Sequence, residues 1–458
     1  MIEATRIASL PGNRRFWRYG TIESVRGLSV ISQGPHAAIG EILWLVDQVS
    51  SGGTGTKGVA YGLPGIGQRL MTLEVSGFLP HGRLLLTPYG ELTGIRQGMR
   101  VVSSGRRLTV PVGRGLLGRV VDGTGSPMDG KPPVWSKRVE ITPEPIEPLS
   151  RKPIDAPLWT GIRAIDGLLT LGRGQRVGIF SGAGVGKTTL LQQMLEGTTA
   201  DVAVVGLIGE RGREISDFYH QLAPAALSRT AVIAATSDSP AILRLRAMDT
   251  TFRVAESFRA MGLDVMLVVD SLTRVALAQS EVGLESGEIA AVRGYTPSVF
   301  HLLPRILERA GRVGPGTITG LFTVLLDGDD PTDPIGDAVR GILDGNLYLS
   351  RHLAERNHFP AIDVLKSLSR VMPEVVSREH QLMAQKVRRV LSLLEKNADL
   401  VALGAYHPGT DPVLDACLRV ERVLDDWLIQ AIDAFDASDT ALEALNMILD
   451  AEPDLDRA

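Results

Sequence analysis

A glycine-rich loop between an apolar strand and a helix is the part of this sequence with the most readable chemistry. Residues 181–188 read SGAGVGKT and follow the apolar run 177–180. The glycines let backbone N–H groups turn toward a phosphate, and the N-terminus of the next helix adds partial positive charge. In such a loop Lys187 reaches the β- and γ-phosphates and the Thr188 hydroxyl binds Mg²⁺. The loop therefore predicts ATP and Mg²⁺ as ligands.

The residues expected to surround the phosphates are Ser181, Gly182, Ala183, Gly184, Val185, Gly186, Lys187, Thr188 and Thr189. Ser181 stands where the usual pattern has glycine. Because the terminal Gly-Lys-Thr is intact, we expect the loop to work despite this difference.

Two carboxylates follow other apolar runs. Asp270 ends the run 266–270, which is how a Walker-B aspartate is presented to Mg²⁺ or its waters. Glu210 follows the run 202–208, so it is expected at the carboxyl edge of a sheet, where ligands bind in such folds. The spacing leaves two interpretations of Glu210: it polarises the attacking water, or it belongs to a solvated charged turn.

The surrounding sequence predicts three kinds of structure in succession. Short β-branched runs with regular glycines, up to about residue 90, are typical of a small β-barrel or sandwich. From about Trp159, apolar strand runs alternate with helical ones, which predicts a parallel sheet with crossover helices. After about residue 375 only helical periodicity remains.

Composition narrows the class of protein. A chain of 458 residues exceeds one ordinary core, and 44% hydrophobic with 22% charged residues is typical of soluble globular proteins. The net charge of -4 gives no electrostatic reason to expect nucleic acid as a partner. A single cysteine, Cys417, excludes an internal disulfide framework and fits a reducing cytoplasm. No apolar run reaches about 18 residues, so membrane association is expected to be peripheral only.

Several segments carry a resemblance to a known family. The motifs GERGRE (209–214) and VVDSLTR (268–274), with the phosphate loop and PAIDVLKSLS (360–369), resemble the rotary-type hexameric ATPases. Four further segments are similar to the flagellar and type III secretion export ATPases: LLGRVVDGTGSPMDG (116–130), RGYTPSVF (293–300), DGDDPTDPIGDAVRGILDG (327–345) and GAYHPGTDP (404–412).

The resemblance implies a multidomain fold. We expect an N-terminal β-barrel over residues 1–95, a central α/β RecA-like P-loop domain over 96–375 and a C-terminal α-helical domain over 376–458. It also implies a homohexamer with nucleotide sites at the subunit interfaces.

The same resemblance implies roles for single residues. Glu210 matches the catalytic carboxylate, Arg211 a contact to the phosphates, and Glu214 with Asp270 the support of Mg²⁺. Arg370 matches an arginine finger that reaches a neighbour's nucleotide, with a plain surface charge as the alternative. Phe359 matches an aromatic that packs on adenine, and Tyr406 is a candidate for the other side of that pocket. Core packing is the alternative for both aromatics.

The function that follows is ATP hydrolysis that energises type III protein secretion, with flagellar export favoured over virulence-type export. The implied partners are a regulatory or stator protein at the N-terminus, a coiled-coil stalk protein in the central pore, a membrane export gate, and secreted substrates with their chaperones. The expected location is the cytoplasm, at the inner face of the cytoplasmic membrane. Where the family has paired prolines, this chain has Ile289 and Ala290, which leaves the pore contacts of that loop open.

Three other functions are alternatives to this one. A catalytic subunit of a proton-driven ATP synthase would carry an acidic DELSEED-type segment, and none occurs between Ser377 and Asp436. An RNA-translocating hexamer would need basic and aromatic residues on its barrel, for which Phe16, Trp17 and Trp44 are the candidates. A nucleotide-binding subunit without turnover is disfavoured because Lys187, Glu210, Asp270 and Arg370 all occur in one chain.

Overall fold

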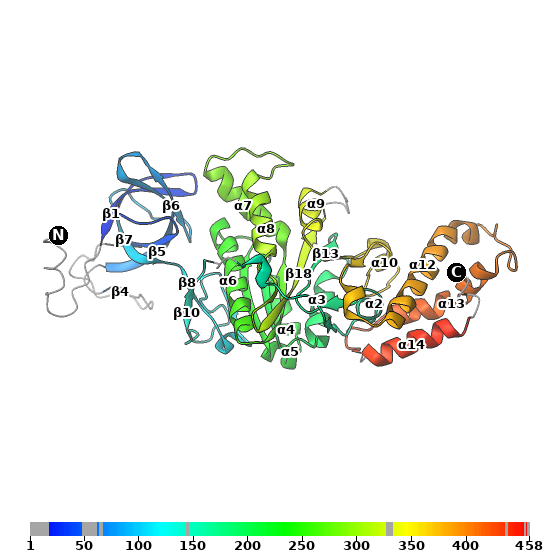
Figure 1. Cartoon of the computed structure of the whole chain (residues 1–458). Coiled ribbons are helices and arrows are strands. Elements are labelled where there is room, and N and C mark those ends of the chain that lie inside the picture. Colours follow the sequence, from blue (N-terminus) through cyan, green and yellow to red (C-terminus); the bar gives the residue numbers. More distant parts are fainter. Residues whose placement is uncertain are drawn as a thin grey trace. The chain divides into compact units, whose positions relative to one another are not determined.

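A computed structural model describes residues 18–47, 62–63, 67–142, 146–326, 333–435, 438–452 and 455. The chain divides into two compact units, one up to Thr109 and one from Val110 (Figure 1). The N-terminal residues expected to bind a regulatory partner, with Phe16 and Trp17, lie outside the described residues. Within the described ranges, no helix combines the length and apolar character needed to cross a bilayer.

The first unit is the predicted β-barrel. Its sheet runs in the order β3-β7-β1-β2-β6-β5-β4, and an additional pairing of β3 with β5 closes it. The barrel interior holds alternate strand residues such as Val30, Leu43 and Leu86, each fully buried. The strands are β1 (Tyr19–Arg26), β2 (Ser29–Gln33), β3 (Glu41–Val46), β4 (Gly62–Leu63), β5 (Gly67–Leu79), β6 (Arg83–Pro88) and β7 (Arg100–Arg107).

The barrel continues past residue 95, the limit expected for this region. Strand β7 pairs antiparallel with both β1 and β3, so it is part of the closed sheet. Its sequence, RVVSSGRR, is mostly polar, and therefore lacks the apolar run that marks the other strands. The barrel is confirmed as the fold of the N-terminal region.

The second unit contains the predicted parallel sheet. In the described residues it has nine strands in the order β20-β19-β13-β18-β16-β14-β15-β9, with β17 paired to β18. Strand β14 is buried along its whole length, as expected of a central strand covered on both faces. The bounds are β9 (Val120–Val121), β13 (Arg176–Ser181), β14 (Val202–Glu210), β15 (Thr230–Thr236), β16 (Asp264–Asp270), β17 (Gly311–Val313), β18 (Gly316–Leu325), β19 (Gly345–Tyr348) and β20 (Leu368–Ser369).

Two cores cover the two faces of this sheet. On β14, Val204 and Ile208 face one core, whereas Val205 and Leu207 face the other. Helices α6 (Ala241–Ala260), α7 (Leu272–Glu285) and α8 (Pro297–Leu307) contribute to the first core, and Figure 1 draws them in green beside β18. Helices α3 (Lys187–Gly197), α4 (Gly212–Gln221) and α5 (Pro224–Ser228) contribute to the second.

Short elements connect these layers. Strand β8 (Thr109–Pro111) pairs with β10 (Arg138–Glu140), and β11 (Pro157–Leu158) pairs with β12 (Leu171–Gly172). The remaining helices of this region are α2 (Arg163–Leu168), α9 (Pro334–Arg340), α10 (Arg351–Glu355) and α11 (Met372–Val375). Asp333 caps α9 by accepting a hydrogen bond from the Gly336 N–H at 2.7 Å, and Pro334 occupies the first helical turn.

The C-terminal region is helical, as predicted. It consists of α12 (Arg378–Ala402), α13 (Pro412–Leu428) and α14 (Ser438–Asp450). Ser377 caps α12, and Asp411 followed by Pro412 begins α13.

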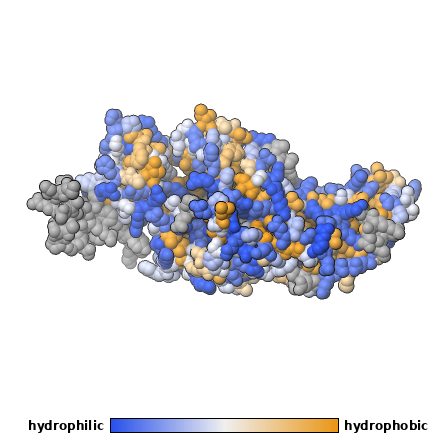
Figure 2. Space-filling view, viewed as in Figure 1, coloured by the Kyte–Doolittle hydropathy of each residue, from blue (hydrophilic) through white to orange (hydrophobic). Residues whose placement is uncertain are grey.

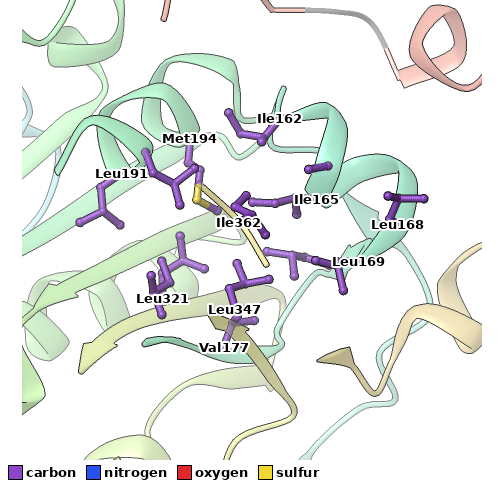
Figure 3. Close-up of a cluster of buried hydrophobic side chains, with 14 of the residues drawn as sticks. Ile162, Ile165, Leu168, Leu169, Val177, Leu191, Met194, Leu321, Leu347 and Ile362 are labelled. Carbon is purple, nitrogen blue, oxygen red and sulfur yellow. The ribbon is translucent and has the colours of Figure 1, made fainter. Parts of the chain in front are cut away.

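The helical region and the nucleotide-type region share one hydrophobic core. Trp427 of α13 packs so closely on α2 that a Cβ added to Gly167 would lie 2.8 Å from its ring. Figure 3 shows the part of this core in which Ile165 from α2 and Met194 from α3 meet Leu321 and Leu347 from the sheet. Burial is thus continuous across residue 376, where a domain limit is expected.

Candidate active site

The phosphate loop leaves the carboxyl end of β13 and enters α3. Gly184 and Gly186 have φ values of +77° and +87°, a left-handed conformation that favours glycine. Ser181 is the last residue of β13 and is 1% exposed, and its hydroxyl has no hydrogen-bond partner among the described residues. Because β13 pairs in parallel with β18 and β19, the loop is fixed by a strand inside the sheet.

Lys187 and Asp270 meet at this edge of the sheet. The Lys187 Nζ donates to Asp270 Oδ1, and the pair is almost fully buried. The same Oδ1 accepts a hydrogen bond of 2.6 Å from the Thr323 hydroxyl on β18. The structure therefore presents an ionic pair with a hydrogen-bonded carboxylate next to the phosphate loop, as a Walker-B aspartate requires.

Glu210 ends β14, which β18 and β16 separate from the strand before the phosphate loop, and it is 8% exposed. Burial raises the pKa of Glu210 to about 8, helped by a hydrogen bond with Glu214 and by the charge of Asp270, and opposed by the charge of Lys187. The hydrogen bond with Glu210 lowers the pKa of Glu214, with Arg211 and Lys187 contributing in the same direction. Glu210 thus holds a proton at neutral pH and donates it to an ionised Glu214.

These groups line one cavity of about 490 Å³. Such a volume suits a small charged ligand. Its lining comprises Gly182, Ala183, Gly184, Gly186, Lys187, Thr188, Thr189, Leu207, Glu210, Arg211, Glu214, Ile215, Phe218, Asp270, Arg274 and Leu325. The structure thereby brings together most of the residues predicted from the motifs, with the side chain of Arg211 mostly exposed at 81%.

The two aromatic candidates lie in different places. Phe359 is 37% exposed, and a Cβ added to Gly186 would lie 3.2 Å from its ring, so the ring touches the phosphate loop. Tyr406 lies in the loop between α12 and α13, where its hydroxyl donates to the Asp411 carbonyl and to the Asp415 carboxylate. Figure 1 shows this loop at the end of the helical region away from α3, and Tyr406 does not line the cavity.

A different segment flanks Phe359. The backbone N–H of Gln430 donates to the Phe359 carbonyl at 2.8 Å, which places the segment after α13 beside the ring. Ile432 of this segment is 62% exposed. The Phe435 ring packs on Gly161 and Gly197, at the end of α3 away from the phosphate loop.

Arg370 follows β20 and is exposed at the edge of the sheet. Its backbone N–H donates to the Asp344 carbonyl. It does not line the cavity of its own chain.

Two residues at the site were missed in the sequence. Thr323 is the one hydroxyl near the end of an otherwise apolar strand segment, GLFTVL, and this contrast could have marked it. Arg274 lies in the first turn of α7, four residues after Asp270, and its Nε is buried with no hydrogen-bond partner among the described residues. A buried, unsatisfied guanidinium nitrogen in this cavity fits an anionic ligand.

The site suits a magnesium ion brought in with its ligand. Nowhere in the described ranges do three His, Cys, Asp or Glu residues gather as a ready metal site. Mg²⁺ is usually bound by one or two protein groups, waters and substrate phosphates, so the Thr188 hydroxyl and the Asp270 carboxylate are sufficient protein donors.

Comparison with known proteins agrees with this geometry. Residues 161–369 match the nucleotide-binding domain of the ATP synthase alpha/beta family, and residues 376–447 match the type III secretion EscN ATPase C-terminal domain.

Individual relatives extend the match to nearly the whole chain. The "Flagellum-specific ATP synthase" of Treponema pallidum is 43% identical over 95% of this chain and 94% of its own length. The "Type 3 secretion system ATPase" of Xanthomonas euvesicatoria is 43% identical over 94% of both chains. The solved structure of the assembled ATPase EscN from enteropathogenic E. coli superposes with a TM-score of 0.85 at 38% identity, covering 94% of this chain and all of that one.

Proposed function

The chain belongs to the family of flagellar and type III secretion ATPases, and on this premise we propose that it hydrolyses Mg²⁺-bound ATP to drive flagellar protein export. The observation that carries the proposal is the convergence of Lys187, Glu210 and Asp270 on one cavity at the phosphate loop. Each group has a task in phosphoryl transfer: neutralising phosphate charge, orienting water and supporting the metal.

Lys187 and the N–H groups of the loop bind the β- and γ-phosphates, which displaces Asp270 from Lys187 toward the metal side. Thr188 and Asp270 would hold Mg²⁺, and Glu214 would support its waters. The metal would supply positive charge that neutralises the charge developing on the phosphate oxygens. Glu210 orients the attacking water and accepts its proton once its own proton has left. Arg211 and Arg274 contact the phosphate oxygens, and Phe359 packs on adenine.

The assembly we propose is a homohexamer around a stalk. It is supported by the solved structures of EscN, one described as the assembled ATPase and another as its complex with its central stalk EscO, which superposes with a TM-score of 0.84 at 38% identity. In such a ring Arg370 reaches the nucleotide of the adjacent subunit, where an arginine finger contributes about 10³- to 10⁵-fold in rate. The further proposed partners are a regulatory protein, the membrane export gate, and substrates with their chaperones.

Flagellar export is favoured over virulence-type export by the motif at 116–130 and the chain length. Relatives of both kinds match at 43% identity. An ATP synthase subunit is the second candidate, since the nucleotide-binding model is shared, but the secretion-type match at 376–447 favours export. We propose a cytoplasmic protein bound peripherally to the inner face of the membrane.

The test replaces the chromosomal copy with a Lys187→Ala variant. We expect the variant protein to accumulate normally while extracellular flagellin and swimming are lost, because the loop no longer neutralises the phosphates. Normal flagellin export with loss of a virulence-type substrate would assign the chain to the other pathway. Export of both would contradict an ATP-driven role.

A further inference from the structure

Phe359 does not itself lie in a strand or a helix. Its ring touches Gly186 of the phosphate loop, yet it lies in a turn after α10. A side chain in such a turn needs outside contacts to keep one position. Two contacts to this turn come from the C-terminal helical region.

Gln430 makes the first of these contacts and is 3% exposed. Its backbone N–H donates to the Phe359 carbonyl, and its side-chain Nε2 donates to the carbonyls of Gly161 and Ala434, each at 2.7 Å. Its Oε1 accepts the N–H of Arg163 at 2.9 Å. Both amide donors and the acceptor are thus satisfied, and one buried residue joins the Phe359 turn, the start of α2 and the segment after α13.

His358 makes the second contact. Its Nδ1 lies 3.0 Å from Oδ1 of Asp425 on α13, and its side chain is 8% exposed. Asp425 lies in the last turn of α13, where the helix macrodipole disfavours an acidic side chain. The pair with His358 compensates for this position, so the carboxylate is placed to hold the turn rather than to stabilise its own helix.

We propose that Gln430 and Asp425 are positioning residues that hold Phe359 against the phosphate loop and thereby set the affinity for ATP. The proposal rests on the proposed contact between Phe359 and adenine. It assigns the helical region a direct part in nucleotide binding, although none of the residues described in that region lines the phosphate cavity.

The test compares ATP with inorganic tripolyphosphate in the full-length enzyme. Tripolyphosphate has no base, so its inhibition constant reports the phosphate site alone. For Asp425→Ala and Gln430→Leu we expect KM for ATP to rise about three- to tenfold, the effect of one or two lost hydrogen bonds. We expect kcat and the tripolyphosphate inhibition constant to stay unchanged. Asp426→Ala, the exposed neighbour on α13, is the matched control and should leave all three unchanged.

The Phe359→Ala variant tests the proposed base contact separately from the positioning role. If it leaves KM for ATP unchanged, the proposed base contact fails, and the positioning role fails with it. If it raises KM while Asp425→Ala and Gln430→Leu do not, only the positioning role is overturned. A parallel rise of the tripolyphosphate constant in those two variants would also overturn it, because they would then be supporting the phosphate loop as a whole.

Discussion

Replacing Glu210 with glutamine removes the carboxyl group that we assign to the attacking water. The pKa of this group is raised to about 8 from an ordinary value of 4.5. At pH 7 only about one tenth of the free enzyme therefore has Glu210 ionised. Because kcat/KM reports the free enzyme, it should rise about tenfold between pH 7 and its plateau above about pH 9. In Glu210→Gln, turnover should fall by about 10²- to 10⁴-fold and this rise should disappear.

The assay is phosphate release at subsaturating ATP with excess Mg²⁺, between about pH 6 and about pH 9.5, which spans both limits of the expected titration. Direct ATP binding is measured in parallel, since Glu210→Gln should still bind. A rise with pH has the sign of a base that must lose its proton. A fall across the same interval would require an essential acid instead, and would refute the assignment.

Variants of two residues on the helix that follows Glu210 test this assignment further. Glu214→Gln removes an ionised hydrogen-bond partner that raises the Glu210 pKa, so its kcat/KM profile should move to lower pH. Asp217→Asn, on the exposed side of the same helix and paired with Arg213, should leave the profile in place. A flat profile in the unaltered enzyme, or the same rise in Glu210→Gln, would show that another group titrates.

Three further outcomes are expected. Inactive Arg370→Ala and Lys187→Ala proteins should regain activity on mixing, because each supplies the group that the other lacks across a subunit interface; no recovery among assembled oligomers would exclude a shared site. Gly186→Ala should weaken ATP binding by roughly tenfold in calorimetry, since φ is +87° and the new Cβ would lie 3.2 Å from the Phe359 ring. Trp427→Ala should lower the free energy of unfolding by about 3–5 kcal/mol in urea titrations, as the ring is 5% exposed; a loss under 1 kcal/mol would contradict a shared core.

The sequence predicted the parts of the site that follow a local rule. Glu210 and Asp270 follow apolar runs, and Lys187 follows the glycine-rich loop after another such run; parallel strands present their carboxyl ends at one edge of a sheet. The strand order is not a local property. Because β18 lies between β13 and β16, Thr323 reaches Asp270, and this neighbour could be named only once the order was known.

Tyr406 is a candidate whose position in the fold could not be predicted from the sequence. Its motif suggested a base pocket, but α12 has 25 residues and so carries the following loop about 37 Å along its axis. The chain returns along α13, and it is the segment after α13 that reaches Phe359. The length of a helix, more than the identity of the aromatic, decided which residue lies beside the phosphate loop.

The end of α13 is connected to the Phe359 turn through the shared hydrophobic core. Trp427, in the last turn of α13, is buried against α2, and three residues later Gln430 bonds to Phe359 and to the start of α2. A displacement of the end of α13 would therefore move the Phe359 turn as well, because no loose linker separates them. The residues that we propose to bind the phosphates lie instead at the ends of β13, β14 and β16 inside the sheet. On this proposal the sheet sets the binding of the phosphates, and the helical region sets the contact with the base.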